Sequence, residues 1–212
     1  MDEDSWVKAA LRGDTNAFAP LVDQYKAPVY NLAYRMLGNR EDAEDAAQET
    51  FLRAYSQIHS YDPSRKFSSW LLSITAHHCI DQLRRRRFAW LPIEALDSAE
   101  WLWSNRDRPE ETVIDGQDRD EVRELLRLLP PKYRLVIVLR YWYDQSYAEI
   151  AQITKMSESA VKTRLHRARE MLSEHLKGSG FAHLADMQSP ESVGTQGDAA
   201  SSLGRQGLVA HS

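Results

Sequence analysis

The chain has 212 residues, which is enough for one or two domains with their own hydrophobic cores. Its single cysteine, Cys79, excludes an internal disulfide framework, and its net charge of −4 hides a strong segregation of charge along the chain. Basic residues outnumber acidic ones in 61–88 and 132–178, whereas acidic residues outnumber basic ones in 1–60 and 89–131. Two basic blocks separated by an acidic block indicate two separate contacts with a polyanion.

Apolar residues repeat at three- and four-residue spacings along most of the chain, so we predict an all-α fold. In the first part of the chain we expect helices over 4–12, 16–37, from 40 or 41 to about 58, and from about 68 to 87. Pro28 should kink or split the second of these helices, and Gly38 should end it. The apolar stripe predicted for the third helix consists of Ala43, Ala47, Phe51, Leu52 and Tyr55.

The third helix also carries a dense set of acidic residues. Glu41, Asp45 and Gln48 or Glu49 lie at three- and four-residue spacings and therefore share a face. This face is either a docking surface for a basic partner or a solvated helix with acids favoured in its first turn. The spacing alone leaves both interpretations open.

The next segment combines cations with aromatic residues. Arg65 and Lys66 stand beside Phe67 and Trp70, and the helix that follows ends in the four arginines of 84–87. This combination suits single-stranded nucleic acid, whose bases stack on aromatic rings while cations neutralise its backbone. The alternative is that both aromatic residues belong to the core, which the spacing favours for Trp70. A helix C-terminus attracts one or two cations and does not explain four.

Potential metal ligands cluster at His77, His78, Cys79 and Asp81. His77 and Asp81 share a helix face, while the other two point elsewhere. No Cys-x-x-Cys or paired-histidine motif accompanies them, so we predict no metal site and no cofactor. The sequence also has no glycine-rich phosphate loop, nucleophile elbow or carboxylate dyad, which argues against an enzyme.

An acidic, tryptophan-containing linker follows from Phe88 to Gly116, and helical periodicity resumes at about Asp118. After Lys177 the composition shifts to glycine, serine, glutamine and alanine, so we expect a disordered tail. The chain starts with acidic residues rather than a secretory leader, and its longest apolar run, Leu135 to Leu139, is too short to cross a bilayer. These features predict a soluble cytoplasmic protein without membrane insertion.

The segment from Ser146 to Arg169 has the pattern of a helix-turn-helix. Ser146 and Glu149 form a predicted capping box at the start of a short helix, and Ser157 is a predicted N-cap of the next one. An apolar stripe then runs through Val161, Leu165, Ala168 and Leu172, and the opposite face carries the hydrogen-bond donors Lys162, Thr163, His166 and Arg167. Such a second helix enters the DNA major groove. The alternative is an ordinary amphipathic helix with a solvated basic face.

Three motifs together resemble a bacterial RNA polymerase sigma factor of the extracytoplasmic-function group, which is group 4 of the sigma-70 family. They are DAEDAAQETFLRAY (42–55), FSSWLLSITAHHCIDQLRRRR (67–87) and LPPKYRLVIVLRYWYDQSYAEIA (129–151) with SESAVKTRLHRAR (157–169). The resemblance covers roughly residues 5–177. It implies two small helical domains, a sigma region 2-like domain over 1–88 and a helix-turn-helix region 4-like domain over 118–177, joined by the acidic linker 89–117 and followed by the tail 178–212.

The resemblance also implies partners and contact residues. Core RNA polymerase would bind through its β′ clamp helices to Asp45, Gln48, Glu49 and Arg53, and through its β flap to the second domain. The promoter −10 element and its melted nontemplate strand would contact Arg65, Lys66, Phe67, Trp70, His77, Asp81, Arg84 and Arg85. The −35 element would contact Lys162, Thr163, Arg164, His166 and Arg167. A membrane-linked anti-sigma factor is a further expected partner.

Two positions depart from the family pattern. His77 stands where the family often has asparagine, which affects the −10 sequence that is read, and Lys155 stands where the turn often has glycine. Two other functions fit parts of the sequence. A stand-alone helix-turn-helix regulator would bind duplex DNA without polymerase, and an adaptor would use its charged faces to bind proteins only. The helix at 42–55 and the block at 67–87 argue against the regulator, which needs neither.

Overall fold

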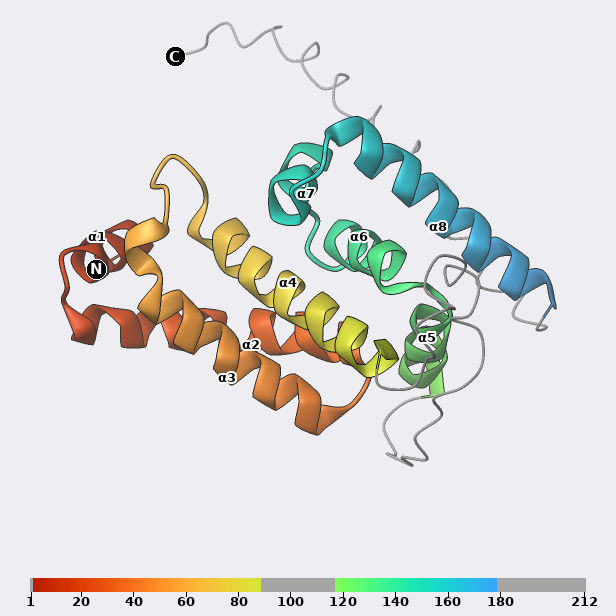
Figure 1. Cartoon of the computed structure of the whole chain (residues 1–212), viewed down its shortest axis with the longest axis horizontal. Helices are drawn as coiled ribbons and strands as arrows, with labels where there is room; N and C mark the ends of the chain where they lie inside the picture. The colour runs from red at the N-terminus through yellow and green to blue at the C-terminus, as the bar shows by residue number, and fades with distance from the viewer. Residues whose placement is uncertain (1, 89–116, 179–212) are drawn as a thin grey trace, which may run out of the picture. The chain divides into compact units, whose positions relative to one another are not determined.

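The structure is a computed structural model that describes residues 2–88 and 117–178 (Figure 1). Within these residues the regular secondary structure is entirely helical, which confirms the all-α prediction. The first range holds α1 (Glu3–Leu11), η1 (Thr15–Ala17), α2 (Phe18–Leu37), α3 (Arg40–Ser56), η2 (Ile58–Ser60) and α4 (Phe67–Phe88). The second range holds α5 (Gln117–Leu128), α6 (Pro131–Tyr141), α7 (Tyr147–Thr154) and α8 (Glu158–Gly178).

The predicted linker 89–117, except its last residue, lies outside the described residues, and so does the predicted tail beyond 178. The domain boundaries at 88 and 118 therefore stay predictions. Among the described residues, no helix is both long enough and apolar enough to span a membrane.

α2 continues through Pro28 as one helix, so the predicted split does not occur. Proline has no N–H to donate to the carbonyl of Gln24, four residues earlier. Gln24 is exposed, so water can take the place of the missing donor. The interruption therefore removes one hydrogen bond at the surface of the helix without ending it.

α3 buries a different face from the predicted one. Its buried side chains are small, and they are Ala43, Ala46, Thr50 and Ala54. The prediction was wrong for Leu52 and Tyr55, which are 66% and 48% exposed. Small side chains let α3 approach α2 and α4 closely, and Thr50 satisfies its own hydroxyl by donating to the Ala46 carbonyl oxygen at 2.8 Å. The larger apolar residues are left on the outer face.

Gly38 ends α2, as predicted, with a left-handed backbone at φ 84°. A Cβ atom at this position would lie 2.6 Å from Nε of Arg127. The same guanidinium donates from Nη2 to the Gly38 carbonyl oxygen at 3.0 Å. The left-handed backbone angle therefore favours glycine here, and a Cβ atom would also displace the guanidinium of Arg127 from the Gly38 carbonyl oxygen.

Gly38→Ala should destabilise the protein more than Gly13→Ala. Gly13 also has a positive φ, 91°, but no atom lies within 4 Å of the position of its Cβ, so alanine there adds only backbone strain of about 1–2 kcal/mol. Alanine at position 38 adds the same strain and displaces Arg127, for a total of roughly 2–3 kcal/mol. Urea unfolding of both variants measures the difference, and equal losses would mean that the Arg127 contact contributes nothing.

Two hydrophobic clusters hold the described residues up to His175 together as one unit. One cluster joins α1, η1, the first part of α2, the end of α3 and the start of α4. The other contains Leu32, Met36 and Leu72 from the first described range together with Leu129 and Ile150 from the second. Figure 1 shows the corresponding arrangement, with α4 alongside α2 and α3 on one side and α6 and α7 on the other. Helices from both ranges thus bury apolar surface against each other.

Candidate nucleic-acid interface

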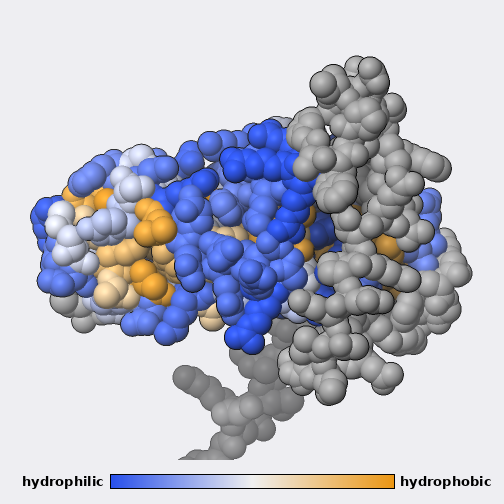
Figure 2. All heavy atoms as spheres, turned by 60° about the horizontal axis from the view of Figure 1, so that its bottom comes forward, coloured by the Kyte–Doolittle hydropathy of each residue, from blue (hydrophilic) through white to orange (hydrophobic). Residues whose placement is uncertain are grey.

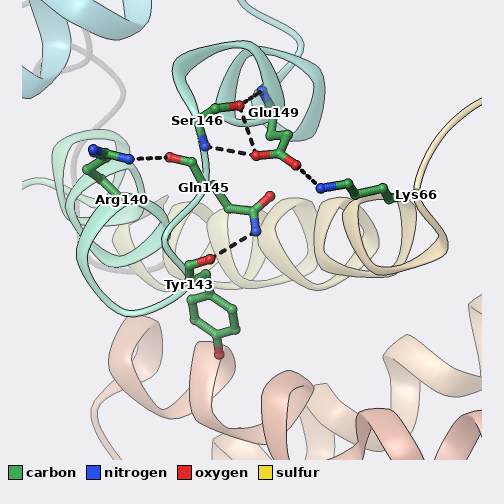
Figure 3. Close-up of polar contacts among 6 residues, drawn as sticks. All are labelled: Lys66, Arg140, Tyr143, Gln145, Ser146 and Glu149. Carbon is green, nitrogen blue, oxygen red and sulfur yellow. Dashed lines mark hydrogen bonds and ion pairs between the residues drawn. The ribbon is translucent and has the colours of Figure 1, made fainter. Parts of the chain in front are cut away.

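The capping box predicted at the start of α7 is present. Ser146 Oγ accepts a hydrogen bond from the Glu149 backbone N–H at 3.2 Å, and the Glu149 carboxylate accepts one from the Ser146 backbone N–H at 2.8 Å. Figure 3 shows these contacts beside the corner between α6 and α7, where Gln145 accepts a hydrogen bond from Arg140 and donates one to the Tyr143 carbonyl oxygen. The reciprocal caps fix where α7 begins.

The turn between α7 and α8 places Lys155 in the left-handed region, with φ 55°. This is the position where the turn of the resembled family often has glycine, and an L-residue there carries a strain of about 1–2 kcal/mol. The Lys155 backbone N–H closes α7 by donating to the Ala151 carbonyl oxygen. The strained backbone therefore lies in the turn that joins the two helices of the helix-turn-helix.

Lys155→Gly should stabilise the protein by about 1 kcal/mol, because it relieves this strain at an exposed position. Asp144→Gly is the matched control, since Asp144 is also left-handed at φ 46° but aspartate tolerates that conformation better than lysine. Thermal unfolding compares the two variants. A destabilised Lys155→Gly variant would show that the lysine side chain contributes more than its backbone strain costs.

α8 separates its apolar and polar faces as predicted. Ser157 caps the helix by accepting a hydrogen bond from the Ala160 N–H at 3.2 Å, while Val161, Leu165 and Ala168 are buried. The side chains on the opposite face are exposed, and they are Lys162, Thr163, His166 and Arg167. The structure therefore presents these four polar side chains together on the second helix of the helix-turn-helix, where the Thr163 hydroxyl donates to the Ser159 carbonyl oxygen at 3.0 Å and His166 lies 3.4 Å from the Glu170 carboxylate.

Arg164 differs from these four residues because its side chain is only partly exposed. This partial burial lowers the pKa of its guanidinium. Its predicted contact with DNA stays a prediction, and the side chain lies at the edge of the exposed face rather than at its centre.

The loop before α4 is held by its own side chains. The Asp62 carboxylate accepts a hydrogen bond from the Ser64 N–H at 2.9 Å, and the Tyr61 hydroxyl donates to the Arg65 carbonyl oxygen. The rings of Tyr61, Phe67 and Trp70 pack together with centroids 5.3–5.5 Å apart. The exposed side chains beside this cluster have acidic partners: Arg65 lies 3.8 Å from the Asp62 carboxylate, and Lys66 donates to Glu149 of α7 at 2.7 Å.

The two predicted aromatic contacts differ in accessibility. Phe67 is 2% exposed and belongs to the N-terminal hydrophobic cluster, as the core interpretation of the sequence had it. Trp70 is partly exposed at the edge of the same cluster. In this conformation Trp70 has an accessible surface for a nucleobase and Phe67 has none.

Along α4, His77 and Asp81 are partly exposed on one face, and Arg84 and Arg85 are exposed. His77 Nδ1 lies 2.6 Å from the Ser73 carbonyl oxygen, and Asp81 pairs with Arg84 at 3.1 Å. Arg86 pairs with Asp42 at the start of α3. Of the three terminal arginines whose side chains are described, Arg84 and Arg86 are exposed and ion-paired, and Arg85 is exposed.

The acidic helix α3 presents a mixed surface. Asp45 and Gln48 are exposed, and Glu49 accepts a hydrogen bond from Arg53 at 2.6 Å. Leu52 and Tyr55 follow Asp45 and Gln48 at helical spacing, and we call these four residues the α3 docking face. In Figure 2 hydrophobic side chains gather at one end of the visible surface, over the C-terminal half of α3, beside a broad hydrophilic area. The spacing of 45, 48, 52 and 55 was the signal that could have extended the predicted face to its apolar half.

Among the described residues, no group of three or more histidine, cysteine, aspartate or glutamate side chains is arranged to hold a metal ion. The potential ligands near Cys79 are dispersed, and the cysteine itself is fully buried.

Comparison with known proteins places both halves of the structure in one family. The family described as Sigma-70 region 2 matches residues 21–89, and the family described as Sigma-70, region 4 matches residues 119–172. The ECF RNA polymerase sigma factor SigW of Bacillus subtilis is 40% identical over 177 residues, which cover 81% of this chain and 95% of SigW. This chain belongs to the ECF RNA polymerase sigma factors. Sigma factors are not enzymes, in agreement with the prediction.

Other relatives support the assignment of this sigma factor. The ECF sigma factor SigE of Mycolicibacterium smegmatis is 35% identical over 74% of this chain and 60% of SigE. The structure of CnrH in complex with the cytosolic domain of CnrY has a TM-score of 0.60, at 25% identity, over 84% of this chain and 98% of CnrH. The sigma factor RpoE of Bartonella quintana, in complex with the anti-sigma factor NepR, shares the fold with a TM-score of 0.61, at 22% identity, over 76% and 96% of the two chains. Region 2 thus corresponds to α2–α4 and region 4 to α5–α8.

Proposed function

We propose that this sigma factor binds core RNA polymerase in the cytoplasm and directs it to promoters, where it reads the −35 and −10 elements and captures the melted nontemplate strand. The observation that carries the proposal is the pairing of two exposed cationic surfaces, one on α8 and one on the loop and α4, with the separate docking face on α3. A protein that recruits polymerase and contacts a promoter twice needs all three surfaces.

For the −35 element, the support comes from α8. Lys162, Thr163, His166 and Arg167 project from one face of the second helix of a helix-turn-helix, which is the helix that lies in the major groove. Arginine and lysine donate to guanine O6 and N7 there, and each such contact discriminates by about 1–3 kcal/mol.

For the −10 element, the support comes from Arg65, Lys66 and Trp70 with the exposed arginines Arg84 and Arg85. Cations and an accessible ring suit a strand whose bases have left the duplex, because each stacked base contributes about 1–3 kcal/mol. His77 and Asp81 lie on α4 between these two groups, where they would contact the same strand. Binding energy from the unstacked bases would supply the melting.

For polymerase, the support comes from the α3 docking face together with the ion-paired Glu49 and Arg53. An apolar patch bordered by charged residues is typical of a protein–protein interface. We assign it to the β′ clamp helices and assign region 4 to the β flap. Two similar structures are complexes with a protein partner, which supports an anti-sigma factor as a further partner.

In vitro transcription with purified core RNA polymerase tests the proposed function. Promoter-dependent transcripts from a library of genomic fragments are expected only when this protein is added. A stand-alone regulator would instead bind operator DNA tightly without polymerase. Tight duplex binding by the protein alone, combined with the absence of any promoter-dependent transcript, would replace the proposal with that alternative.

A further inference from the structure

The ring of Tyr147 lies where three helices of region 4 meet. Tyr147 is the first residue of α7, and cationic side chains from α6 and α8 lie against its ring. The Arg140 guanidinium carbon, from α6, is 5.7 Å from the ring centroid, and the Lys162 ammonium nitrogen, from α8, is 5.8 Å from it. Cations within about 6 Å of an aromatic centroid are attracted to the negative face of the ring. Tyr147 therefore connects α6 with the helix that we assign to the −35 element.

The position of the Tyr147 ring is fixed by its surroundings. The capping box of Ser146 and Glu149 sets where α7 begins, and Tyr147 comes directly after the cap. The side chain is partly buried and packs against the larger hydrophobic cluster, which includes Ile150 and Val161. The ring is thus held by α7 and by the core, and the part of it that stays accessible can contact side chains at the surface.

Arg140 is tied to the same corner of the fold by polar contacts. Its Nη1 group donates to the Gln145 carbonyl oxygen at 3.1 Å (Figure 3). The same group lies 3.6 Å from the Asp144 carboxylate, which offsets its charge. Arg140 is therefore a structural partner of the ring, whereas Lys162 is exposed on the face that we assign to DNA.

Lys162 differs from its neighbours on α8 in what holds its side chain. Thr163 donates to the Ser159 carbonyl oxygen, within the same helix. His166 lies near the Glu170 carboxylate, also within the same helix. Lys162 instead contacts a ring from another helix. A lysine stem is long and flexible, and a contact that is already formed before binding reduces the conformational entropy that is lost when the stem is ordered.

The contact with Tyr147 leaves Lys162 able to bind DNA. An ammonium group carries three N–H donors, and its attraction to a ring face comes from its charge. The donors that point away from the ring can reach a guanine edge or a phosphate oxygen. Lys162 also lies in the first half of α8, and the N-terminal part of a recognition helix is the part that contacts base edges. The conformation that the ring favours is thus one in which Lys162 can contact the element.

We propose that Tyr147 is a positioning residue for −35 recognition, and that its ring holds the Lys162 side chain in the conformation that binds DNA. A cation–π contact at an exposed site makes the held conformation roughly two- to fivefold more populated. The affinity for the −35 element rises by up to the same factor, because the binding-competent conformation is more often present before DNA arrives. This inference rests on the proposed function, since Lys162 must contact the −35 element for its conformation to matter.

Binding of promoter DNA by the reconstituted holoenzyme tests this role. The full-length chain is combined with core RNA polymerase, and fluorescence anisotropy gives the Kd for a labelled promoter at one fixed salt concentration. Tyr147→Leu keeps an apolar side chain in the cluster but removes the ring, and it should raise Kd by roughly two- to fivefold. Tyr147→Phe keeps the ring and should bind like the unmodified chain. A Tyr147→Phe variant that binds as weakly as Tyr147→Leu would assign the effect to the hydroxyl and overturn the inference.

A double-mutant cycle separates positioning from a purely structural role. In a Lys162→Ala background the ring has no ammonium group to hold, so Tyr147→Leu should no longer change Kd. Arg167→Ala is the matched background, because Arg167 is exposed on the same face but lies more than one helical turn further along α8. There Tyr147→Leu should keep its full effect of roughly two- to fivefold. Equal effects in all three backgrounds would show that Tyr147 acts only through the fold and would overturn the inference.

The contact can also be measured in the free chain, without DNA or polymerase. A ring current shifts the NMR signals of protons that lie over an aromatic face. The ε-methylene signal of Lys162 should therefore be shifted upfield in the unmodified chain and in Tyr147→Phe, and the shift should disappear in Tyr147→Leu. Thermal unfolding shows whether Tyr147→Leu folds, and the other two proteins test the contact if it does not. An unshifted signal in the unmodified chain would overturn the inference.

The outcomes distinguish this inference from the proposed function. If the unmodified chain gives no promoter-dependent transcript, the proposed function is removed, and the role of Tyr147 is removed with it. If the holoenzyme binds its promoter but Tyr147→Leu leaves Kd unchanged, the role of Tyr147 alone is overturned and the proposed function stands.

Discussion

Replacing Lys162 and Arg167 together with alanine should lower transcription from promoters that carry a −35 element by about 30-fold or more, because each of the two contacts with a base edge or phosphate contributes about 1–3 kcal/mol. Both side chains are exposed on one face of α8, and the apolar residues that anchor this helix are on the opposite face. The fold and the binding to core RNA polymerase should therefore remain unchanged.

The matched control also replaces one lysine and one arginine with alanine, but at a surface to which we assign no contact. Lys8 and Arg12, on and just after α1, are also exposed, and Lys8→Ala/Arg12→Ala should leave transcription within about twofold, since solvated surface charges contribute little. Run-off transcription measures promoter use, and fluorescence anisotropy with labelled protein measures polymerase binding. Loss of polymerase binding in the α8 variant would contradict the division of labour between α8 and α3.

Replacing Leu52 and Tyr55 together with alanine should weaken core RNA polymerase binding by about 30-fold or more. A buried interface anchor contributes about 2 kcal/mol or more, and tyrosine is among the residues most often found in that role. Both side chains are exposed in the free chain, so little of the free energy of unfolding depends on them, apart from the edge contact of Tyr55 with Phe18 at 5.3 Å.

Lys8→Ala/Arg12→Ala is also the control for this surface. Both residues are exposed, and they lie outside the α3 docking face and outside region 4. Polymerase affinity measured by anisotropy should fall for the α3 variant and change little for the control, while thermal unfolding checks that both variants fold. Equal losses in the two variants would show that the α3 docking face is not the binding surface proposed here.

Local sequence signals predicted the elements of this fold well. Gly38 ends α2, and the capping residues Ser146 and Ser157 begin α7 and α8 where expected, because these interactions lie within a few residues of each other. Helical spacing also separated the buried and exposed sides of α8. The same reasoning failed on α3, where Leu52 and Tyr55 were expected inside and are exposed, because the choice of buried face depended on how closely small residues let the neighbouring helices approach.

Local sequence signals also predicted only part of the candidate site. The donors of α8 and the cations of 65–66 could be recognised from residue type and spacing, and the family resemblance supplied their expected roles. The sequence could not show that Phe67 is enclosed by other rings, or that Glu149 serves both as a cap for α7 and as a partner for Lys66. Pairwise contacts across 83 positions have no local signature.

The helical fold, the helix-turn-helix with its polar outer face and the separation of charges into blocks can all be read from the amino-acid sequence. These properties follow from periodicity, capping and composition, which act over one or two helical turns. The contacts of the second described range with α2, in which Arg134 donates to the Met36 carbonyl oxygen and Tyr143 to that of Pro28, could be seen only in three dimensions. That arrangement depends on surfaces brought together from distant parts of the chain, where desolvation and close packing set the free energy.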